Sequence, residues 1–380
     1  MNVLALEPYY GGSHKAFLDQ WRARSRHSWT VLTLPAHKWK WRMRHGAHAL
    51  ADEVAALQEE GKGHRRWDVI FCSDMLNLAE FYGLAPVELR AVPAVAYFHE
   101  NQLTYPVRSE TERDYHFGYT NMTTAVAARR VWFNSEFNRS SFLDALPAFL
   151  KRMPDYYPEG VGERIRARSE IQHPGIEELP TRGPRNPGPL RILWAARWEH
   201  DKNPEAFFDA IEALERAGVD YRISVIGEQF RDCPPIFAQA HRDFAQRIDR
   251  WGYQQTREEY VQALLDADVF VSTATHEFFG LSAVEAIAAG AYPLLPNRLA
   301  YPELLSDVPS ANLSDYLYPP GRAELSTRLT SLARRLDAGE SISDFAASAR
   351  RAIHPFLWTH RAPALDDAIE AVGDAQTNVV

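Results

Sequence analysis

Two carboxylates lie eight residues apart in the stretch ATHEFFGLSAVEAIAAG, which runs from Ala274 to Gly290. Glu285 is the one charged residue within the otherwise apolar run 281–290. A helix that is apolar on all sides is buried, and a buried carboxylate is costly unless hydrogen bonds are donated to it. The vicinal hydroxyls of a sugar are one such pair of donors. The pattern also allows an internal arginine as the partner of Glu285, with Glu277 solvated in a loop.

The residues around this stretch have the chemistry of a phosphate site. The helix that starts near Gly280 and Leu281 offers free N–H groups and the positive end of its dipole, both of which suit phosphate. Phe279, beside this turn, is a candidate of the same set. Arg197 and Lys202 follow an expected strand in AARWEHDKNP, at the position where a doubly wound domain binds anions. A diphosphate leaving group needs such cations, although two ordinary surface cations are the alternative.

A second group of candidates lies in the first third of the chain. Two glycines follow the first expected strand, and glycine lets backbone N–H groups approach a ligand closely; a plain tight turn is the alternative. The run FHENQ, 98–102, is a polar cluster at the carboxyl end of another expected strand. A lone histidine is more often structural, but this context makes His99 a site candidate. The candidates of this group are Gly11, Gly12, Ser13, His14, His99, Asn101, Gln102 and Tyr105.

The stretch HKWKWRMRH, 37–45, holds four Lys or Arg residues, two tryptophans and no acid. Cations can bind phosphates and aromatic rings can stack on unpaired bases, so the stretch could bind RNA. The alternative is the start of a helix whose long basic side chains extend around two packed tryptophans. The residues in question are Lys38, Trp39, Lys40, Trp41, Arg42 and Arg44.

The elements that must position these residues alternate between strands and helices. Buried-looking strands at 3–6, 29–34, 67–72, 93–98 and 130–134 are each followed by a helical stretch, and a second series lies at 190–197, 221–227, 268–274 and 291–295. This alternation predicts parallel sheets with helices on both faces. We therefore expect an α/β protein with two facing Rossmann-like, doubly wound domains and the active site in the cleft between them.

The proline- and glycine-rich stretch 178–189 is typical of a loop between domains. We expect an N-terminal, acceptor-side domain over 1–180, a C-terminal, donor domain over 186–355, and a terminal helix within 356–380 that packs back on the N-terminal domain.

Composition narrows the class of protein. The 380 residues carry a formal charge of -8, so the whole chain is not a polybasic nucleic-acid binder, although residues 1–50 hold eight Lys or Arg and two acids. Two cysteines without paired spacing argue against a disulfide framework or a cysteine-rich zinc site. The start of the chain does not resemble a signal peptide and no apolar run is long enough for a membrane span. We expect a cytoplasmic protein with no membrane partner.

Two glutamates separated by seven residues, preceded by an Arg–Lys loop, resemble the retaining family-4 glycosyltransferases of the GT-B fold. That resemblance implies that Glu277 contacts the donor sugar and Glu285 the nucleotide ribose, while Arg197 and Lys202 neutralise the diphosphate. The catalytic candidates are His99, Arg197, Lys202 and Glu277. The donor-binding candidates are Gly11, Gly12, Arg197, Lys202, Glu277, Phe279, Gly280, Leu281 and Glu285.

The N-terminal half resembles the tRNA-queuosine α-mannosyltransferases. The motifs are LEPYYGGSHKAF at 6–17, LPAHKWKWRMR at 34–44, YFHENQLTYPV at 97–107 and FGYTNMTTAVAARRVWFNSEFNRSSF at 117–142, and NRLAYPELL at 297–305 fits as well. The resemblance covers roughly residues 1–305 and implies GDP-mannose as donor and the queuosine nucleoside of a tRNA anticodon as acceptor. The acceptor-binding candidates are Ser13, His14, Lys38, Trp39, Lys40, Trp41, Arg42, Arg44, Asn101, Gln102 and Tyr105.

Other functions remain open at this point. An NAD-dependent oxidoreductase would need a G-x-G-x-x-G turn, and YYGGSH is not one. A non-catalytic RNA-binding protein on a degenerate transferase fold is disfavoured by the intact carboxylates and cations. A small glycoside or a lipid-linked acceptor is the alternative within the transferases. Neither half shows an aspartate-rich metal motif, so we predict that no metal or other cofactor is required.

Overall fold

The computed structural model describes residues 1–60, 66–107, 113–180, 182–183, 185, 187–230 and 232–374. These residues form two compact units: a first unit of Met1–Gly175 together with the segment that begins at Trp358, and a second unit of Ile176–Leu357. The described part of the proline-rich stretch 178–189 belongs to the second unit, where Leu179 is part of the core. The chain therefore passes between units at 175/176 and 357/358, a few residues from the boundaries that composition indicated.

The first unit is built on one six-stranded sheet in the order β2-β1-β3-β4-β5-β6. Every pairing in it is parallel. The strand order reverses between β1 and β3, and ligands of doubly wound sheets bind outside the carboxyl ends of the strands at such a reversal. The strands are β1 (Asn2–Tyr10), β2 (Ser28–Pro35), β3 (Val69–Ser73), β4 (Ala94–Phe98), β5 (Arg130–Phe133) and β6 (Ser169–Ile171).

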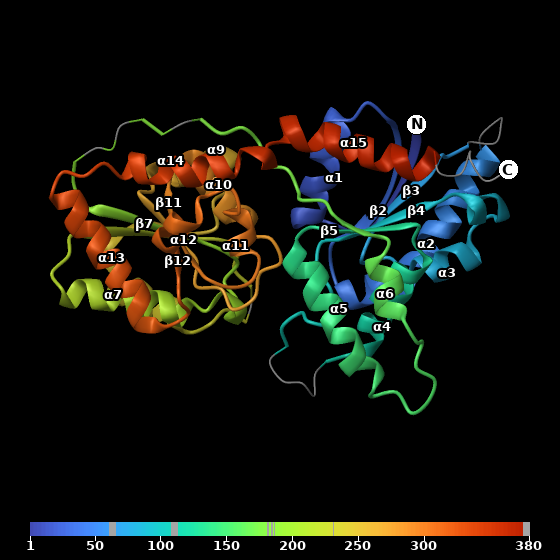
Figure 1. Ribbon diagram of the computed structural model, residues 1–380, viewed down its shortest axis with the longest axis horizontal. Coiled ribbons are helices and arrows are strands. Elements are labelled where there is room, and N and C mark those ends of the chain that lie inside the picture. The colour runs from blue at the N-terminus through green and yellow to red at the C-terminus, as the bar shows by residue number, and fades with distance from the viewer. Residues whose placement is uncertain are drawn as a thin grey trace. The chain divides into compact units, whose positions relative to one another are not determined.

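Both faces of this sheet are covered by helices (Figure 1). Side chains alternate along β1, so that Val3 and Ala5 pack with α1 and α15 while Leu4 and Leu6 pack with α2, α3, α4 and α5. The two sides form two separate cores, as a parallel sheet buried on both faces requires. The helices are α1 (Gly12–Arg24), α2 (Trp39–Glu60), α3 (Leu78–Leu84), α4 (Tyr115–Ala127), α5 (Glu136–Leu150), α6 (Val161–Arg166) and α15 (Trp358–Asp374), with a 3-10 turn, η1 (Val87–Ala91).

The helix α15 is joined to the first unit by buried polar contacts as well as by its apolar face. Asp366 accepts hydrogen bonds from the indole Nε1 of Trp21 and from the hydroxyl of Ser25, both at 2.8 Å. The guanidinium of Arg361 donates to the carbonyl of His173 at 2.9 Å and to the side chain of Gln172 at 2.8 Å. The chain thus returns to the first unit after completing the second.

The second unit repeats the architecture with a sheet in the order β12-β11-β10-β7-β8-β9. All of its pairings are parallel, and its order reverses between β7 and β10. The expectation of two doubly wound α/β domains is therefore confirmed. The strands are β7 (Leu190–Ala195), β8 (Tyr221–Ile226), β9 (Ile248–Gly252), β10 (Val269–Val271), β11 (Tyr292–Pro296) and β12 (Leu317–Tyr318).

Helices α9, α10 and α14 lie on one side of this second sheet and α7 and α13 on the other (Figure 1). The sequence of α7 shows why these helices form where they do. Pro204 occupies the first helical turn, where its missing N–H is not needed, and Phe207, Ile211 and Leu214 recur at helical spacing and are buried. The helices are α7 (Pro204–Arg216), α8 (Ile236–Asp243), α9 (Arg257–Asp266), α10 (Leu281–Ala289), α11 (Tyr301–Leu304), α12 (Ser310–Tyr316), α13 (Arg322–Asp337) and α14 (Ile342–Ala352), with 3-10 turns η3 (His200–Lys202), η4 (Ala245–Arg247) and η5 (His354–Phe356).

Among the residues that the structure describes, no helix has the length and apolar character needed to cross a bilayer.

Candidate active site

Two loops meet at the strand reversal of the second sheet. The loop after β7 contains η3, and the loop after β10 contains Glu277. The carbonyl of Asp201 accepts the backbone N–H of Thr275 at 2.7 Å, and the hydroxyl of Thr273 donates to the carbonyl of Lys202 at 2.8 Å. These two hydrogen bonds fix the positions of the two loops relative to each other. Lys202 and Glu277, which the sequence assigned to phosphate and sugar binding, are thereby brought together.

Lys202 is the buried cation of this site. Its ammonium donates to the carbonyl of His276 at 2.8 Å and to the carboxylate of Glu277 at 3.3 Å, and it lies 3.1 Å from a carboxylate oxygen of Asp201. Burial lowers the pKa of Lys202, but the charges of Glu277 and Asp201 outweigh this, so that its pKa lies above the ordinary value. Lys202 is therefore a permanent positive charge, fixed in position by its neighbours.

Arg197 contributes a second, more exposed cation. Its guanidinium lies 3.1 Å from the carboxylate of Glu199, and its side chain is 43% exposed. Its charge lowers the pKa of both Lys202 and His276, which places it in the same electrostatic field. Burial, followed by the charge of Lys202, lowers the pKa of His276 to about 4, so this ring is neutral at pH 7. The site thus combines a buried cation with a more exposed one.

The turn before α10 needs a glycine. Gly280 has a φ of 97° in the left-handed region, and a Cβ added there would lie 3.1 Å from the ring of Tyr301 and 3.6 Å from Glu277. Leu281 begins the helix directly after it, and the first amides of a helix have no partner within it. The side chain of Phe279 differs from expectation, because it is buried and packs edge-on against Phe356. It belongs to the hydrophobic core of the second unit.

Glu285 has the partner that the sequence left open as an alternative. Arg257 donates to one carboxylate oxygen at 2.8 Å, and the hydroxyl of Tyr260 donates to the other at 2.7 Å. The side chain of Glu285 keeps 16% of its surface exposed. A carboxylate has about four acceptor positions, so two bonds from the protein leave room for hydroxyl donors of a ligand.

We predict that Glu285→Ala lowers the affinity for GDP by about 1.5–3 kcal/mol, the cost of losing a hydrogen bond to a charged group. Isothermal calorimetry measures this directly. Tyr260→Phe is the matched control, because it removes a partner of the carboxylate but leaves the carboxylate itself. Unchanged GDP affinity in a folded Glu285→Ala protein would make Glu285 a purely structural partner of Arg257.

The strand reversal of the first sheet holds a cluster of polar and ionisable groups that are buried or half-buried. Glu7 lies on β1, Ser73 ends β3, and His99 follows β4. Glu7 accepts hydrogen bonds from the hydroxyl of Ser73 at 2.9 Å and pairs with Nδ1 of His14 at 3.2 Å. Asp74 accepts the backbone N–H of His99 at 2.9 Å. The rings of His14 and His99 lie with their centroids 4.0 Å apart.

The surroundings of His14 and His99 shift their pKa values in opposite directions. Burial lowers the pKa of His14, but the carboxylates of Glu7, Asp74 and Glu100 outweigh it and raise the pKa to about 9. Burial, and then the charge of His14, keep the pKa of His99 well below its ordinary value. Burial raises the pKa of Asp74, whose Oδ2 has no hydrogen-bond partner among the described residues. At neutral pH a charged His14 therefore lies next to a neutral His99.

The same cluster has donor atoms of the kind that bind a metal ion. The ligand atoms of Glu7, His14 and His99 all lie within 4.8 Å of one another, and histidine nitrogens with a carboxylate are a donor set that suits zinc. A metal would need His14 in its neutral form, whereas the three nearby carboxylates favour the protonated form. The charges therefore favour an ion pair between His14 and Glu7 at neutral pH.

Some of the other candidates of the first unit have side chains that bind the protein. Gly11 directly precedes α1 and Gly12 begins it. A Cβ on Gly11 would lie only 2.3 Å from Ala36, so no side chain fits there. Ser13 is exposed and Tyr105 is half-buried. Asn101 and Gln102 are corrections, because their side chains bind the protein: Asn101 donates to Asn138 at 2.9 Å, and Gln102 donates to Glu100 at 2.8 Å. Both side chains are buried and stabilise the loop after β4.

The sequence reasoning missed Glu7, Ser73 and Asp74. A signal for Glu7 was present, because it is an acid directly after the apolar run Val3–Leu6 of the first strand. The run SDM after the third strand was a weaker signal. The strand pattern put these residues at the carboxyl ends of their strands, but it did not show that β1 and β3 are adjacent.

The side chains of the basic stretch 37–45, at the start of α2, are of two kinds: some are exposed and others pack against the protein. Lys38, Lys40, Trp41 and Arg44 are exposed, as an RNA-binding role requires. Arg42 is a correction, because it is buried. Its guanidinium donates to the carbonyl of Pro35 at 2.9 Å and contacts ring nitrogens of His37 and His45 at 2.8 and 3.0 Å. Trp39 is half-buried against Phe117, with ring centroids 4.9 Å apart.

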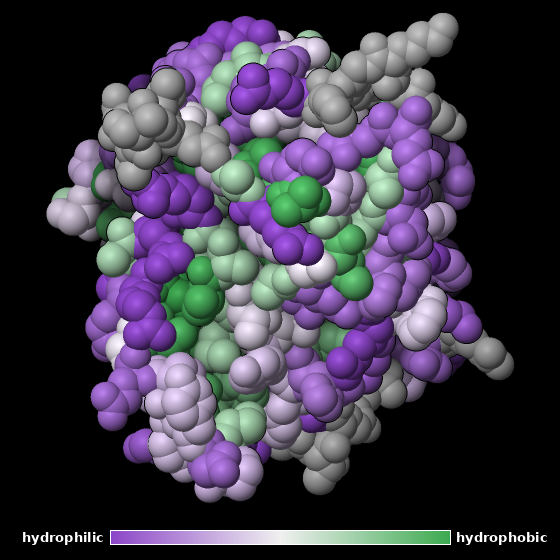
Figure 2. All heavy atoms as spheres, turned by 90° about the vertical axis from the view of Figure 1, so that its right-hand side faces the viewer, coloured by the Kyte–Doolittle hydropathy of each residue, from purple (hydrophilic) through white to green (hydrophobic). Residues whose placement is uncertain are grey.

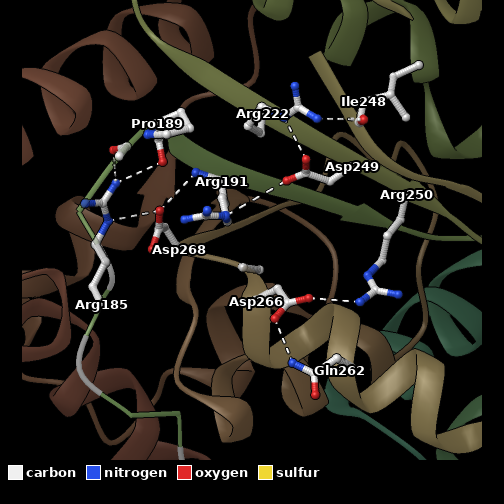
Figure 3. Close-up of polar contacts among 12 residues, drawn as sticks. Arg185, Pro189, Arg191, Arg222, Ile248, Asp249, Arg250, Gln262, Asp266 and Asp268 are labelled. Carbon is white, nitrogen blue, oxygen red and sulfur yellow. Dashed lines mark hydrogen bonds and ion pairs between the residues drawn. The ribbon is translucent and has the colours of Figure 1, made fainter. Parts of the chain in front are cut away.

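The opposite, amino-terminal edge of the second sheet is also rich in charge, but its charges are compensated (Figure 3). Asp268 is fully buried, accepts the backbone N–H of Arg191 at 2.9 Å, and forms ion pairs with Arg185 at 3.1 Å and with Arg182. Asp249 and Arg222 pair in the same way. We interpret this edge as structural. The small cavity there is lined by Arg191, Ile192, Ser224, Asp249, Arg250, Asp266 and Ala267.

Comparison with solved structures identifies the fold. A sucrose-phosphate synthase from Thermosynechococcus elongatus superposes with a TM-score of 0.71 at 15% identity, covering 99% of this chain and all of that one. Anabaena HepE in complex with UDP has a TM-score of 0.66 at 16% identity, covering 98% of this chain and 100% of its own. A family model for group 1 glycosyl transferases matches residues 175–332. The fold is GT-B, and the chain is a glycosyltransferase.

A second family model, for the N-terminal part of tRNA-queuosine α-mannosyltransferase, matches residues 2–176. The tRNA-queuosine α-mannosyltransferase of Drosophila melanogaster is 36% identical over 315 residues, which are 80% of this chain and 81% of that protein. A GDP-mannose-dependent phosphatidylinositol dimannoside mannosyltransferase of Mycobacterium tuberculosis is 28% identical over 38% of this chain and 40% of its own. The chain belongs to the tRNA-queuosine α-mannosyltransferase family.

Proposed function

We propose that this glycosyltransferase moves mannose from GDP-mannose to the queuosine nucleoside of a tRNA anticodon, with retention of the α configuration. The observation that carries the acceptor is the 36% identity to the Drosophila melanogaster enzyme, which extends over both halves of the chain. Support for the donor comes from the Mycobacterium tuberculosis relative, whose name specifies GDP-mannose. The reaction would take place in the cytoplasm.

In this proposal the second unit binds the donor. Arg197 and Lys202 neutralise the diphosphate, and the amides at the start of α10 bind a phosphate. Glu277 contacts the sugar, and its ion pair with Lys202 at 3.3 Å supports a site in which diphosphate and sugar are adjacent. Glu285 binds the ribose with the acceptor positions that Arg257 and Tyr260 leave open.

The chemistry follows from positioning and charge. No side chain of the site is an activated nucleophile, so we propose attack of the acceptor hydroxyl on the same face of the sugar from which the diphosphate leaves. The departing diphosphate oxygen takes the proton of that hydroxyl. Cations fixed where charge develops stabilise such a step most, and holding both reactants in place removes much of the entropic cost. We propose a catalytic role for the neutral ring of His99, which can donate a hydrogen bond to a ligand. We propose that no metal is needed.

The experiment that tests this function is incubation of the purified chain with GDP-mannose and tRNA that carries or lacks queuosine. Nucleoside mass spectrometry should show a hexose added to queuosine in the first tRNA and no product with the second. The same reaction after treatment with EDTA should proceed at an unchanged rate. Hexose transfer to a small glycoside or a lipid-linked sugar, with none to tRNA, would contradict the proposed acceptor.

A further inference from the structure

One surface of the first unit carries cations stacked on aromatic rings. At the start of α2, the ammonium of Lys40 lies 5.7 Å from the ring centroid of Trp39. The guanidinium of Arg44 lies 5.2 Å from the ring centroid of Phe117, on the first turn of α4. Both cations are exposed. The starts of α2 and α4 thus present positive charge above aromatic rings.

A matching arrangement lies on the other side of the same turn of α4. Tyr115 is two residues before Phe117, and the guanidinium of Arg152, just beyond the end of α5, lies 4.7 Å from its ring centroid and donates to its hydroxyl. Tyr115 also stacks on Phe149 at 5.9 Å between centroids. Both cation–aromatic groups thus lie at the first turn of α4, and we call the exposed side chains of α2, α4 and the end of α5 around this turn the α2–α4–α5 surface.

Exposed aromatic rings lie on α2 and α4 and in the segment after α5. Trp41 on α2 is 60% exposed, Tyr119 on α4 is 48% exposed, and Tyr156 and Tyr157 after α5 are 84% and 48% exposed. Rings of this size are usually buried or serve recognition. The face of the molecule shown in Figure 2 is predominantly hydrophilic, with hydrophobic side chains in small separate areas.

The α2–α4–α5 surface is connected to the buried histidine cluster. Met43, Met75 and Phe117 form a small core against which Trp39 and Tyr9 pack. The ring of Tyr9 lies 6.0 Å from that of His14. A nucleoside near His14 and His99 would thus have its flanking nucleotides close to this surface.

We infer that the α2–α4–α5 surface binds the single-stranded nucleotides on either side of the acceptor nucleoside, an inference that rests on the proposed function. Lys38, Lys40 and Arg44 would contact phosphates on one side of the first turn of α4, and Lys151 and Arg152 on the other. Unpaired bases stack on exposed aromatic rings whatever their sequence. Because the whole chain has a formal charge of -8, attraction to RNA must come from such a local group of cations.

Two charge-removing variants test the two sides separately: Lys38→Ala with Lys40→Ala and Arg44→Ala, and Lys151→Ala with Arg152→Ala. Fluorescence anisotropy with labelled tRNA at several salt concentrations should show weaker binding for each. The slope of the logarithm of affinity against the logarithm of salt should fall by roughly 0.7 for each lost contact to a single strand. Tyr156→Ala should weaken binding by about 5- to 150-fold through lost stacking. Arg216→Ala, whose side chain is 69% exposed in the second unit, is the control and should bind normally.

Kinetic measurements distinguish a failure of this inference from a failure of the proposed function. Each variant should lower kcat/KM for tRNA while its affinity for GDP stays that of the wild type. Wild-type activity on tRNA together with unchanged binding by both variants would overturn the inference and leave the proposed function intact. A wild-type protein that transfers no mannose to tRNA would instead overturn the proposed function. Loss of thermal stability and GDP affinity together with tRNA binding would mean that the surface is structural, and would overturn the inference as well.

Discussion

Replacing Lys202 with methionine is expected to lower kcat on the order of 10²–10³-fold, the effect of removing one preorganised donor from a developing negative charge. The ammonium is held within 3.3 Å of its protein partners, so it needs little reorganisation when the diphosphate leaves. Charge on the diphosphate grows as the glycosidic bond breaks, so the loss should fall on turnover more than on donor binding. Steady-state kinetics with GDP-mannose measure both parameters.

The stability of this variant must be controlled, because Lys202 is buried between Asp201 and Glu277. Removing one member of a buried ion pair costs about 3–5 kcal/mol of stability. The double variant Lys202→Met with Asp201→Asn removes one charge of each sign and should recover much of that loss. The double variant should fold, and its kcat should still be far below that of the wild type. A variant in which only KM rises, with kcat preserved, would contradict a role for Lys202 in the transition state.

The alternation of strands and helices predicted both the fold and the donor-side half of this site. The carboxyl ends of parallel strands meet at one edge of a sheet, so Lys202 after one strand and Glu277 after another had to approach each other if the strands were adjacent. The side chain of Phe279 could not be placed in this way. Its burial against Phe356 depends on where the turn after α14 returns to the sheet, and that contact joins residues far apart in the sequence.

The acceptor-side half was less accessible because polar side chains at the end of a strand have two uses. They can face a ligand, or they can satisfy backbone groups of the loop, and Asn101 and Gln102 do the second. Arg42 was misread for a related reason, since composition does not show which face of a helix is buried. The proline-rich stretch 178–189 indicated a loop, as expected, but composition alone could not show that this loop belongs to the second unit.

Glu7 and His14 should make the stability of the protein depend on pH above neutrality. The pKa of His14 is raised to about 9 in the folded protein, against about 6.5 in an unfolded chain. The folded state therefore holds a proton that the unfolded state releases between these values. The resulting stabilisation, about 3 kcal/mol, is fully present below pH 6.5 and is lost as the pH rises through about 9.

The measurement is the difference in the free energy of unfolding between the wild type and Glu7→Gln, by urea titration from pH 6 to 10. Glutamine keeps an acceptor for the hydroxyl of Ser73 but removes the carboxylate that holds the proton on His14. Because the other titrating groups are common to both proteins, most of their contribution cancels in the difference. The wild type should be more stable below pH 6.5, and the two curves should converge between pH 6.5 and 9. Parallel curves across that range would show that His14 is not held as a cation by Glu7, and burial would then be left as the main cause of the lowered pKa of His99.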